Sequence, residues 1–155
     1  MQYNEAVERF YKKLATHQIM ALATSVNDHV TVRNVSCIIY NNKIFFKTDR
    51  EFRKTKMLLS NPNVALCSGG VQVEGTALNI GLVVDEPGRK FKKLYEQYWA
   101  TSYNAFPHKD SEILIAVTPS FVEIWDQDEN NYGFQIFIDF NTETAELKEY
   151  DKPAK

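Results

Sequence analysis

Residues 19–48 read IMALATSVNDHVTVRNVSCIIYNNKIFFKT, and this stretch decides the fold. It contains three runs rich in β-branched and aromatic residues, separated by the pairs Asn27-Asp28 and Asn41-Asn42. Such runs are typical of β-strands, and asparagine tolerates the positive φ that a tight hairpin turn requires. The stretch therefore predicts three consecutive antiparallel strands joined by two hairpins.

The rest of the chain continues this pattern of strands with short helices between them. Further strands are predicted at 63–68, 71–84, 112–125 and 132–140, and amphipathic helices at 4–15, at 49–59 and from Pro87 onward. Asp49 is the expected N-cap of the middle helix. Because helical crossovers between successive strands are missing, the pattern favours an antiparallel barrel over a parallel sheet. We expect one domain over 1–150 and a frayed C-terminal tail at 151–155.

The composition excludes several classes of protein. A hydrophobic fraction of 44% and a charged fraction of 25% are typical of a folded globular chain. The net charge of -2 argues against a broad basic face for nucleic acid, and no apolar run approaches the roughly 18 residues of a membrane-spanning helix. The N-terminal residues interleave charges with apolar side chains, unlike a signal peptide. We expect a cytoplasmic protein in which Cys37 and Cys67 are buried, reduced thiols.

The polar residues match no common catalytic or metal-binding motif. The glycines between residues 69 and 75 lack the spacing of a phosphate-binding loop, and no histidine has metal-ligand spacing to another ligand. A basic cluster does stand out at the start of the middle helix, and it comprises Arg50, Arg53, Lys54 and Lys56. Helix N-termini and basic side chains both attract phosphate, so the cluster indicates a phosphate-monoester site. A solvated basic helix face is the alternative interpretation.

Several short segments follow one another along the chain in a characteristic order. They are Arg33-Asn34-Val35-Ser36-Cys37-Ile38, Lys47-Thr48, Arg53-Lys54, Asn61-Pro62, Val71-Gln72-Val73-Glu74-Gly75, Val117-Thr118-Pro119 and Val122-Glu123-Ile124-Trp125. In this order the chain resembles the pyridoxamine 5'-phosphate oxidase-like family of FMN-binding proteins, and within it the small bacterial, nitroimidazole-resistance-like flavoproteins. The resemblance implies an antiparallel six-stranded split β-barrel with short flanking helices, mainly β (α+β), that binds FMN as a homodimer.

The resemblance also implies which residues bind the cofactor. They are Arg33, Asn34, Val35, Ser36, Lys47, Thr48, Arg53, Lys54 and Trp125. By this resemblance the two arginines and Lys54 hold the FMN phosphate, and the hydroxyl of Thr48 adds a hydrogen bond. The backbone around Val35-Ser36 faces the isoalloxazine, and Trp125 reaches the flavin of the other subunit.

Three departures from the family pattern point away from pyridoxamine-phosphate oxidation. Ile38 replaces a substrate-side lysine, Gly70 replaces a glutamine, and Asn131-Tyr132-Gly133 stands where the vitamin-processing oxidases carry an Arg-Leu-His motif. The resemblance therefore implies an FMN-dependent oxidoreductase for another small molecule, in which the flavin performs the chemistry. The alternatives are a non-catalytic flavin-binding or sensor module and a binder of haem or deazaflavin on the same fold.

Overall fold

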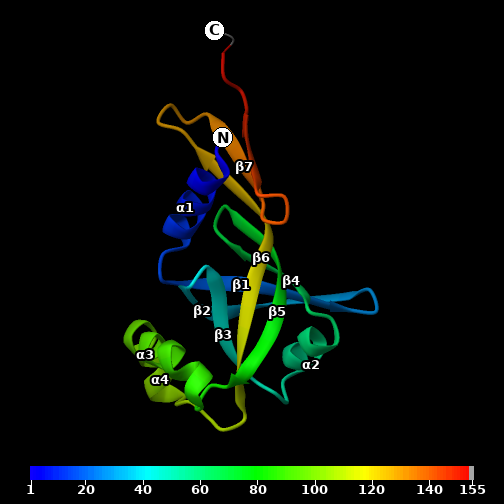
Figure 1. The fold of residues 1–155 in the computed structure, drawn as a ribbon, viewed down its shortest axis with the longest axis vertical. Helices are drawn as coiled ribbons and strands as arrows, with labels where there is room; N and C mark the ends of the chain where they lie inside the picture. Colours follow the sequence, from blue (N-terminus) through cyan, green and yellow to red (C-terminus); the bar gives the residue numbers. More distant parts are fainter. Residues whose placement is uncertain (154–155) are drawn as a thin grey trace.

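The structure is a computed structural model that describes residues 1–153. Six antiparallel strands form a barrel: β1 (His17–Val26), β2 (His29–Tyr40), β3 (Lys43–Asp49), β4 (Asn63–Ser68), β5 (Val71–Leu82) and β6 (Glu112–Gln127). Their order is β3-β2-β1-β4-β5-β6, and pairing of β3 with β6 closes the barrel (Figure 1). The predicted six-stranded, mainly β barrel is confirmed.

The first three strands form the predicted pair of hairpins. Strand β1 pairs with β2 from His17↔Ile38 to Val26↔His29, and β2 pairs with β3. Both turn pairs, Asn27-Asp28 and Asn41-Asn42, have φ between 50° and 64°. These are the left-handed conformations that a two-residue hairpin turn requires, which is why the asparagines predict the turns correctly.

Two further strands extend the sheet beyond the barrel. Strand β7 (Gly133–Asp139) pairs with the second half of β6, and β8 (Thr144–Glu149) pairs with β7. Helix α1 (Tyr3–Leu14) packs against this extension and buries Phe10 and Leu14 (Figure 1). Strand β8 is an addition to the predicted elements, because its short sequence TAELKE has only two apolar residues, Ala145 and Leu147.

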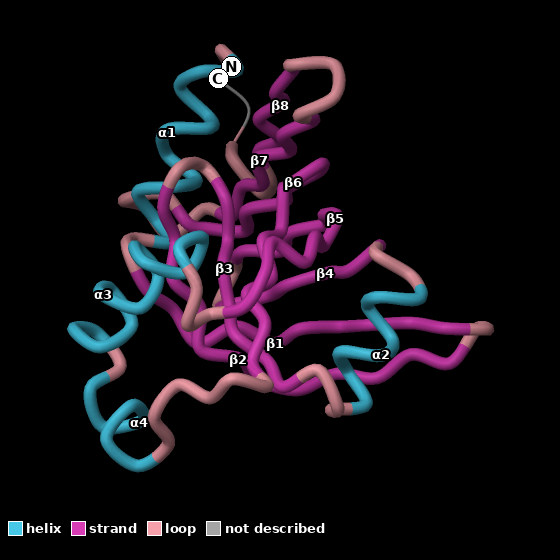
Figure 2. The backbone as a smooth tube through the Cα atoms, turned by 60° about the horizontal axis from the view of Figure 1, so that its bottom comes forward, coloured by secondary structure: helices cyan, strands magenta, loops and turns pink. Residues whose placement is uncertain are grey.

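The remaining helices lie on two sides of the barrel. Helix α2 (Arg53–Ser60) lies beside the β1–β2 hairpin, whereas the short helix at Glu86–Gly88, α3 (Arg89–Tyr98) and α4 (Ala100–Ala105) lie on the other side (Figure 2). One core fills the barrel, and a second core lies between α3 and the outer face of the strands. Residues 1–153 contain no helix long and apolar enough to cross a membrane.

Two local expectations need correction. The helix predicted at 49–59 begins at Arg53, and Asp49 is not its N-cap. Asp49 ends β3 instead, where its backbone carbonyl accepts a hydrogen bond of 2.6 Å from Thr55 Oγ1. Cys37 is buried as expected, but Cys67 is exposed because it occupies an outward position in the alternation of β4. In the predicted tail at 151–155, Lys152 contacts Glu149 at 2.8 Å, and residues 154–155 lie outside the described residues.

Candidate functional site

A cleft of about 170 Å³ lies between β2 and β3, with the start of α2 on one side and α3 on the other. We call it the β2–β3 cleft. Six of the nine predicted cofactor-binding residues line it: Asn34, Val35, Ser36, Lys47, Thr48 and Lys54. Residues far apart in sequence complete its wall, namely Tyr95 from α3 and Glu112 from β6. The structure therefore brings most of the predicted site together.

Arg33, Arg53 and Lys54 form a group of positive charges beside this cleft, which we call the cation cluster. Burial lowers the pKa of Lys54, and the nearby charge of Arg33 lowers it further. Burial likewise lowers the pKa of Arg33, with a second contribution from Arg53. Within residues 1–153 none of the three forms an ion pair with a carboxylate. Like charges gathered without a counter-charge are an anion-binding arrangement, because a bound anion removes their mutual repulsion.

Arg33 is anchored to β1 and β2 and does not line the cleft. Its guanidinium donates to the Leu22 carbonyl at 3.1 Å, to Thr24 Oγ1 at 2.9 Å and to Thr31 Oγ1. A guanidinium has five N–H donors, so this anchoring leaves donors for a ligand. The protein thus fixes the orientation of Arg33 before any anion binds.

The hydroxyl of Thr48 has a hydrogen-bond partner within the chain. Its Oγ1 lies 2.7 Å from Thr55 Oγ1, and Thr55 Oγ1 in turn donates to the carbonyl of Asp49. Because a hydroxyl has one proton, Thr48 must be the donor to Thr55. In this geometry Thr48 fastens α2 to β3, and its hydroxyl has no proton to donate to a phosphate.

The ammonium of Lys47 is also committed to partners within the chain. Its Nζ lies 3.1 Å from Glu112 Oε1, 3.2 Å from His108 Nδ1 and 3.5 Å from the Phe106 carbonyl. These three acceptors match its three N–H donors. Lys47 therefore gives the cleft a positive charge and an alkyl wall, while the hydrogen bonds of its ammonium hold the segment 106–112 against β3.

His108 lies at the edge of the site, although it is distant in sequence from the predicted binding residues. Its side chain is buried, and its Nε2 makes no hydrogen bond but lies 3.4 Å from a carboxylate oxygen of Glu96. Burial lowers the pKa of His108, as does the charge of Lys47, while Glu96 and Glu112 oppose the change. A neutral ring that accepts from Lys47 through Nδ1 carries its proton on Nε2, toward Glu96.

Trp125 does not join the other predicted residues within one chain. It lies thirteen residues beyond Glu112 on β6, which corresponds to roughly 40 Å along an extended strand. Its backbone N–H donates to the carbonyl of Gly70 at 2.8 Å, and its ring lies 5.4 Å from that of Tyr150. Trp125 is 48% exposed and lies near the end of β6 that is remote from Glu112.

Sequence reasoning missed three residues of the site: Tyr95, His108 and Glu112. Tyr95 lies on the apolar face of α3, which packs as the outer core. Closure of the barrel sets β6 against β3 and pairs Glu112 with Asp49. No local signal could identify these residues, because the contacts that bring them to β3 span about 60 residues of sequence.

Comparison of the sequence with models of known protein families and with curated proteins finds no match. Solved structures do match the fold. PhzG from Burkholderia lata 383, in complex with tetrahydrophenazine-1-carboxylic acid, has a TM-score of 0.63 at 13% identity, over 97% of this chain and 93% of that one.

Two further structures are similar over nearly the full length. A pyridoxamine 5'-phosphate oxidase-related, FMN-binding protein from Nostoc punctiforme PCC 73102 has a TM-score of 0.58 at 13% identity, over 96% and 95% of the two chains. A NimC/NimA family protein from Clostridium acetobutylicum has a TM-score of 0.55 at 16% identity, over 95% and 94%. At these identities the likeness concerns the fold. The chain has the split β-barrel fold of the pyridoxamine 5'-phosphate oxidase-like proteins.

Proposed function

We propose that this protein is an FMN-dependent oxidoreductase that binds the phosphate of FMN at the cation cluster. The observation that carries the proposal is the gathering of Arg33, Arg53 and Lys54 without a carboxylate partner among residues 1–153. Burial and repulsion from neighbouring cations disfavour the charges of Arg33 and Lys54 in the free protein, and a phosphate dianion offsets both effects. A phosphate also suits the anchored, planar guanidinium of Arg33.

The β2–β3 cleft continues from the cluster along β2 and fits a cofactor with a polar edge. Asn34 and Ser36 present their side chains from the outer face of β2, and Lys47 brings a positive charge balanced by Glu112. The bound flavin would supply hydride or electron transfer, and the chain would bind and orient it. The FMN-binding neighbour from Nostoc punctiforme supports a flavin on this fold.

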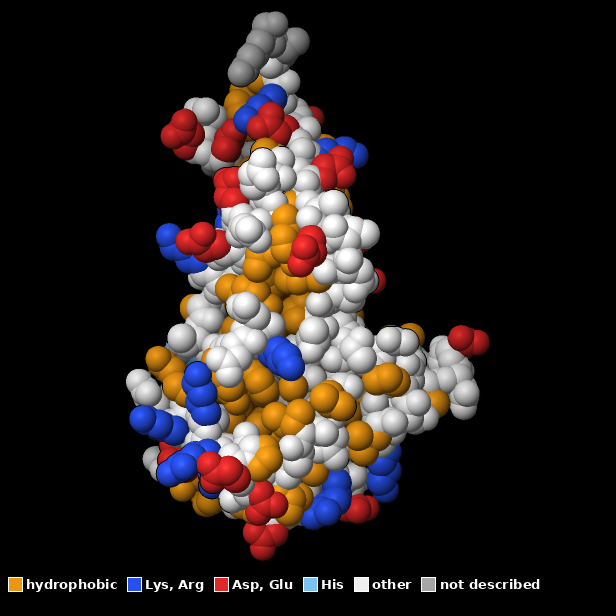
Figure 3. All heavy atoms as spheres, in the orientation of Figure 1, with side chains coloured by type: hydrophobic (Ala, Val, Ile, Leu, Met, Phe, Trp, Pro, Cys, Tyr) orange, Lys and Arg blue, Asp and Glu red, His pale blue; other side chains and the backbone are white. Residues whose placement is uncertain are grey.

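We further propose that the working form is a homodimer. The cleft of one chain, about 170 Å³, is smaller than the roughly 300–1,000 Å³ of typical cofactor sites. Hydrophobic side chains gather over β5 and β6 in the view of Figure 3, and Leu78 of β5 is 59% exposed. A twofold partner that covers such a face could also bring its Trp125 to the flavin, whereas the Trp125 of the same chain lies too far along β6 to reach the cleft.

Titration of the cofactor-free protein with FMN and with riboflavin tests the proposed site. The two ligands differ only in the phosphate, and a charge-assisted hydrogen bond contributes about 1.5–3 kcal/mol. We expect FMN to bind at least about tenfold more tightly than riboflavin. Equal affinity for the two ligands would refute a phosphate site at the cation cluster. The absorption spectrum of the purified protein separates flavin from the haem alternative.

A further inference from the structure

A second cavity, of about 240 Å³, adjoins the β2–β3 cleft between the end of β3 and the segment 102–112. We call it the side pocket. It shares Lys47, Asp49, Phe52, Tyr95 and Glu112 with the cleft, so a molecule in the side pocket would lie next to a ligand in the cleft. An engineered apolar cavity of about 150 Å³ holds benzene, so the side pocket has room for one or two fused rings.

Aromatic rings form much of the wall of the side pocket. Phe52 lies at the turn before α2, Tyr95 on α3 and Phe106 directly after α4. Phe52 and Phe106 are 55% and 71% exposed, although large aromatic side chains are usually covered. A flat ring placed between such side chains covers them and gains stacking contacts.

The charges of the side pocket balance one another. Lys47 pairs with Glu112 at 3.1 Å, and the charge of Lys109 helps to lower the pKa of Asp49. Asp49 also accepts hydrogen bonds from the Ser111 hydroxyl at 2.7 Å and from the backbone N–H of Glu51 at 2.9 Å. With two cations and two carboxylates in its wall, the side pocket of the FMN-loaded protein offers no net charge to offset the hydration that a charged ligand would lose, which is unfavourable.

Two hydroxyl groups in the wall remain available for a polar substituent. The side chains of Tyr95 and Ser102 line the side pocket, and neither hydroxyl hydrogen-bonds to another group within residues 1–153. Tyr95 is otherwise well buried, and burial raises the pKa of its phenol, with a smaller effect from Glu112. Its hydroxyl is therefore a neutral donor and acceptor at the boundary between the two cavities.

From these observations we infer that the side pocket binds an uncharged aromatic molecule of one or two fused rings that carries a hydroxyl or carbonyl group. The exposed rings of Phe52 and Phe106 hold its faces, and the hydroxyl of Tyr95 binds its polar group. The assignment of the side pocket as the substrate site of the oxidoreductase rests on the proposed function, because the shared wall would place the bound aromatic ring beside the flavin. Binding of the ring itself does not require the flavin.

Calorimetric titration at pH 7 with 2-naphthol, naphthalene and 2-naphthoate tests the side pocket in the FMN-loaded protein. We expect 2-naphthol to bind, and 2-naphthoate to bind at least tenfold more weakly because of its charge. Phe106→Ala should weaken 2-naphthol about tenfold, since it removes one exposed ring from the wall. Leu147→Ala, on the distant strand β8, is the matched control for loss of an exposed apolar side chain and should leave the affinity unchanged.

Tyr95→Phe tests the hydroxyl separately from the ring. It should weaken 2-naphthol about fivefold and leave naphthalene unchanged, because naphthalene has no polar group. Equal affinity for 2-naphthol and 2-naphthoate would overturn the inference, and so would an affinity for 2-naphthol that Phe106→Ala leaves within twofold.

The same titrations on the FMN-free protein separate the two proposals. Binding of 2-naphthol with these variant effects in a protein that shows no preference for FMN would support the side pocket and refute only the flavin site. Loss of the variant effects in both forms would refute the side pocket alone.

Discussion

Substitution of Lys54 by methionine separates the phosphate site from the general stability of α2. Methionine keeps the length and flexibility of the side chain but removes its charge. In the FMN complex this change removes one charge-assisted hydrogen bond, about 1.5–3 kcal/mol. The affinity for FMN should therefore fall roughly 10- to 150-fold. The affinity for riboflavin, which has no phosphate, should stay within about threefold.

The stability of the cofactor-free protein should respond much less. Lys54→Met relieves repulsion from Arg33, but it also removes the contact of the ammonium with the Phe52 ring, 5.6 Å from its centroid. An exposed contact of this kind contributes about 0.5–1 kcal/mol, so the two effects oppose each other. We expect a net change within about 1 kcal/mol, or 2–4 °C in Tm for a chain of this size.

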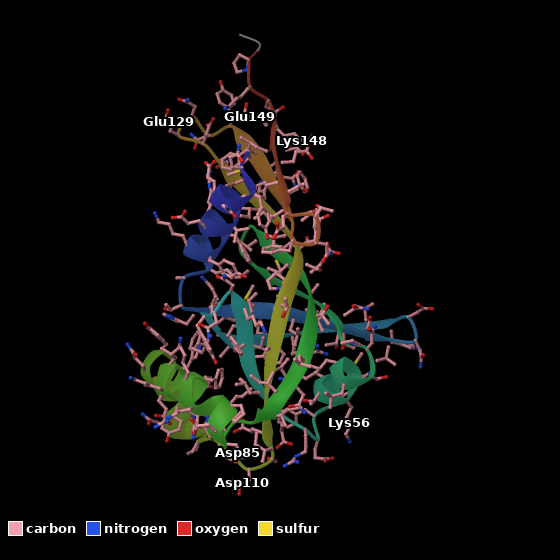
Figure 4. The ribbon with its side chains drawn as sticks, viewed as in Figure 1. Lys56, Asp85, Asp110, Glu129, Lys148 and Glu149 are labelled. Carbon is pink, nitrogen blue, oxygen red and sulfur yellow. The ribbon has the colours of Figure 1, made fainter. Side chains whose placement is uncertain are left out.

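Lys56→Met is the matched control, because it makes the same change on the same helix, two positions after Lys54. The Lys56 side chain is 63% exposed and pairs with Glu51 at 3.4 Å, and Figure 4 shows it on the outer side of α2. Flavin fluorescence titrations and thermal unfolding of the three proteins give the comparison. Equal loss of FMN affinity in both variants, or equal loss of FMN and riboflavin in Lys54→Met, would refute the phosphate site.

Three other predictions address the dimer, the turn before β5 and the buried histidine. Sedimentation at micromolar concentration should show a dimer that FMN stabilises by mass action, and a monomer with stoichiometric FMN would contradict the shared site. Gly70→Ala should destabilise the protein by at least about 2 kcal/mol in urea unfolding, because the new Cβ would lie 2.2 Å from the Trp125 carbonyl oxygen. The control is Gly69→Ala, whose Cβ would have no atom within 4 Å. It should destabilise the protein only by the roughly 1–2 kcal/mol that its positive φ costs. His108 should make the fold less stable in acid. Its pKa in the folded chain is lowered from 6.5, so the unfolded chain binds more protons. The contribution of His108 to the free energy of unfolding is therefore present above pH 6.5 and is lost as the pH falls toward the lowered pKa. His108→Gln should reduce that loss, and an unchanged pH dependence of urea unfolding would refute the assignment.

The parts of the fold that sequence could predict are those set by neighbouring residues. The pairs Asn27-Asp28 and Asn41-Asn42 specify two hairpins because asparagine and aspartate tolerate positive φ, and the apolar alternation specifies the strands between them. Closure of the barrel is different in kind. It pairs Ile44 with Val117 and Asp49 with Glu112, and nothing in either strand alone specifies the other as its partner.

The candidate site divides in the same way. Lys47, Thr48 and Lys54 lie within one short stretch, so sequence places them together correctly. The sequence could not show that Thr48 donates its hydroxyl proton to Thr55, or that the Lys47 ammonium makes hydrogen bonds to the segment 106–112. These roles depend on geometry between elements, and they leave the cation cluster, Asn34 and Ser36 as the parts of the predicted site with donors for a ligand.

The position of the cleft follows from the way β2 meets the helices outside the barrel. Val35, Cys37 and Ile39 point inward, so the residues between them face outward. Ile38 is apolar and lies under α3 in the outer core, next to Phe45 and Leu114. Two residues earlier on the same face the apolar cover ends, and Ser36 and Asn34 line an open cleft. The change from Ile38 to Ser36 thus marks the point where packing stops and a binding surface begins. A ligand that lies along β2 would meet the cation cluster and the adjoining aromatic side pocket, whose Phe52 ring lies 5.6 Å from the Lys54 ammonium, and each of the two has its own ligand test.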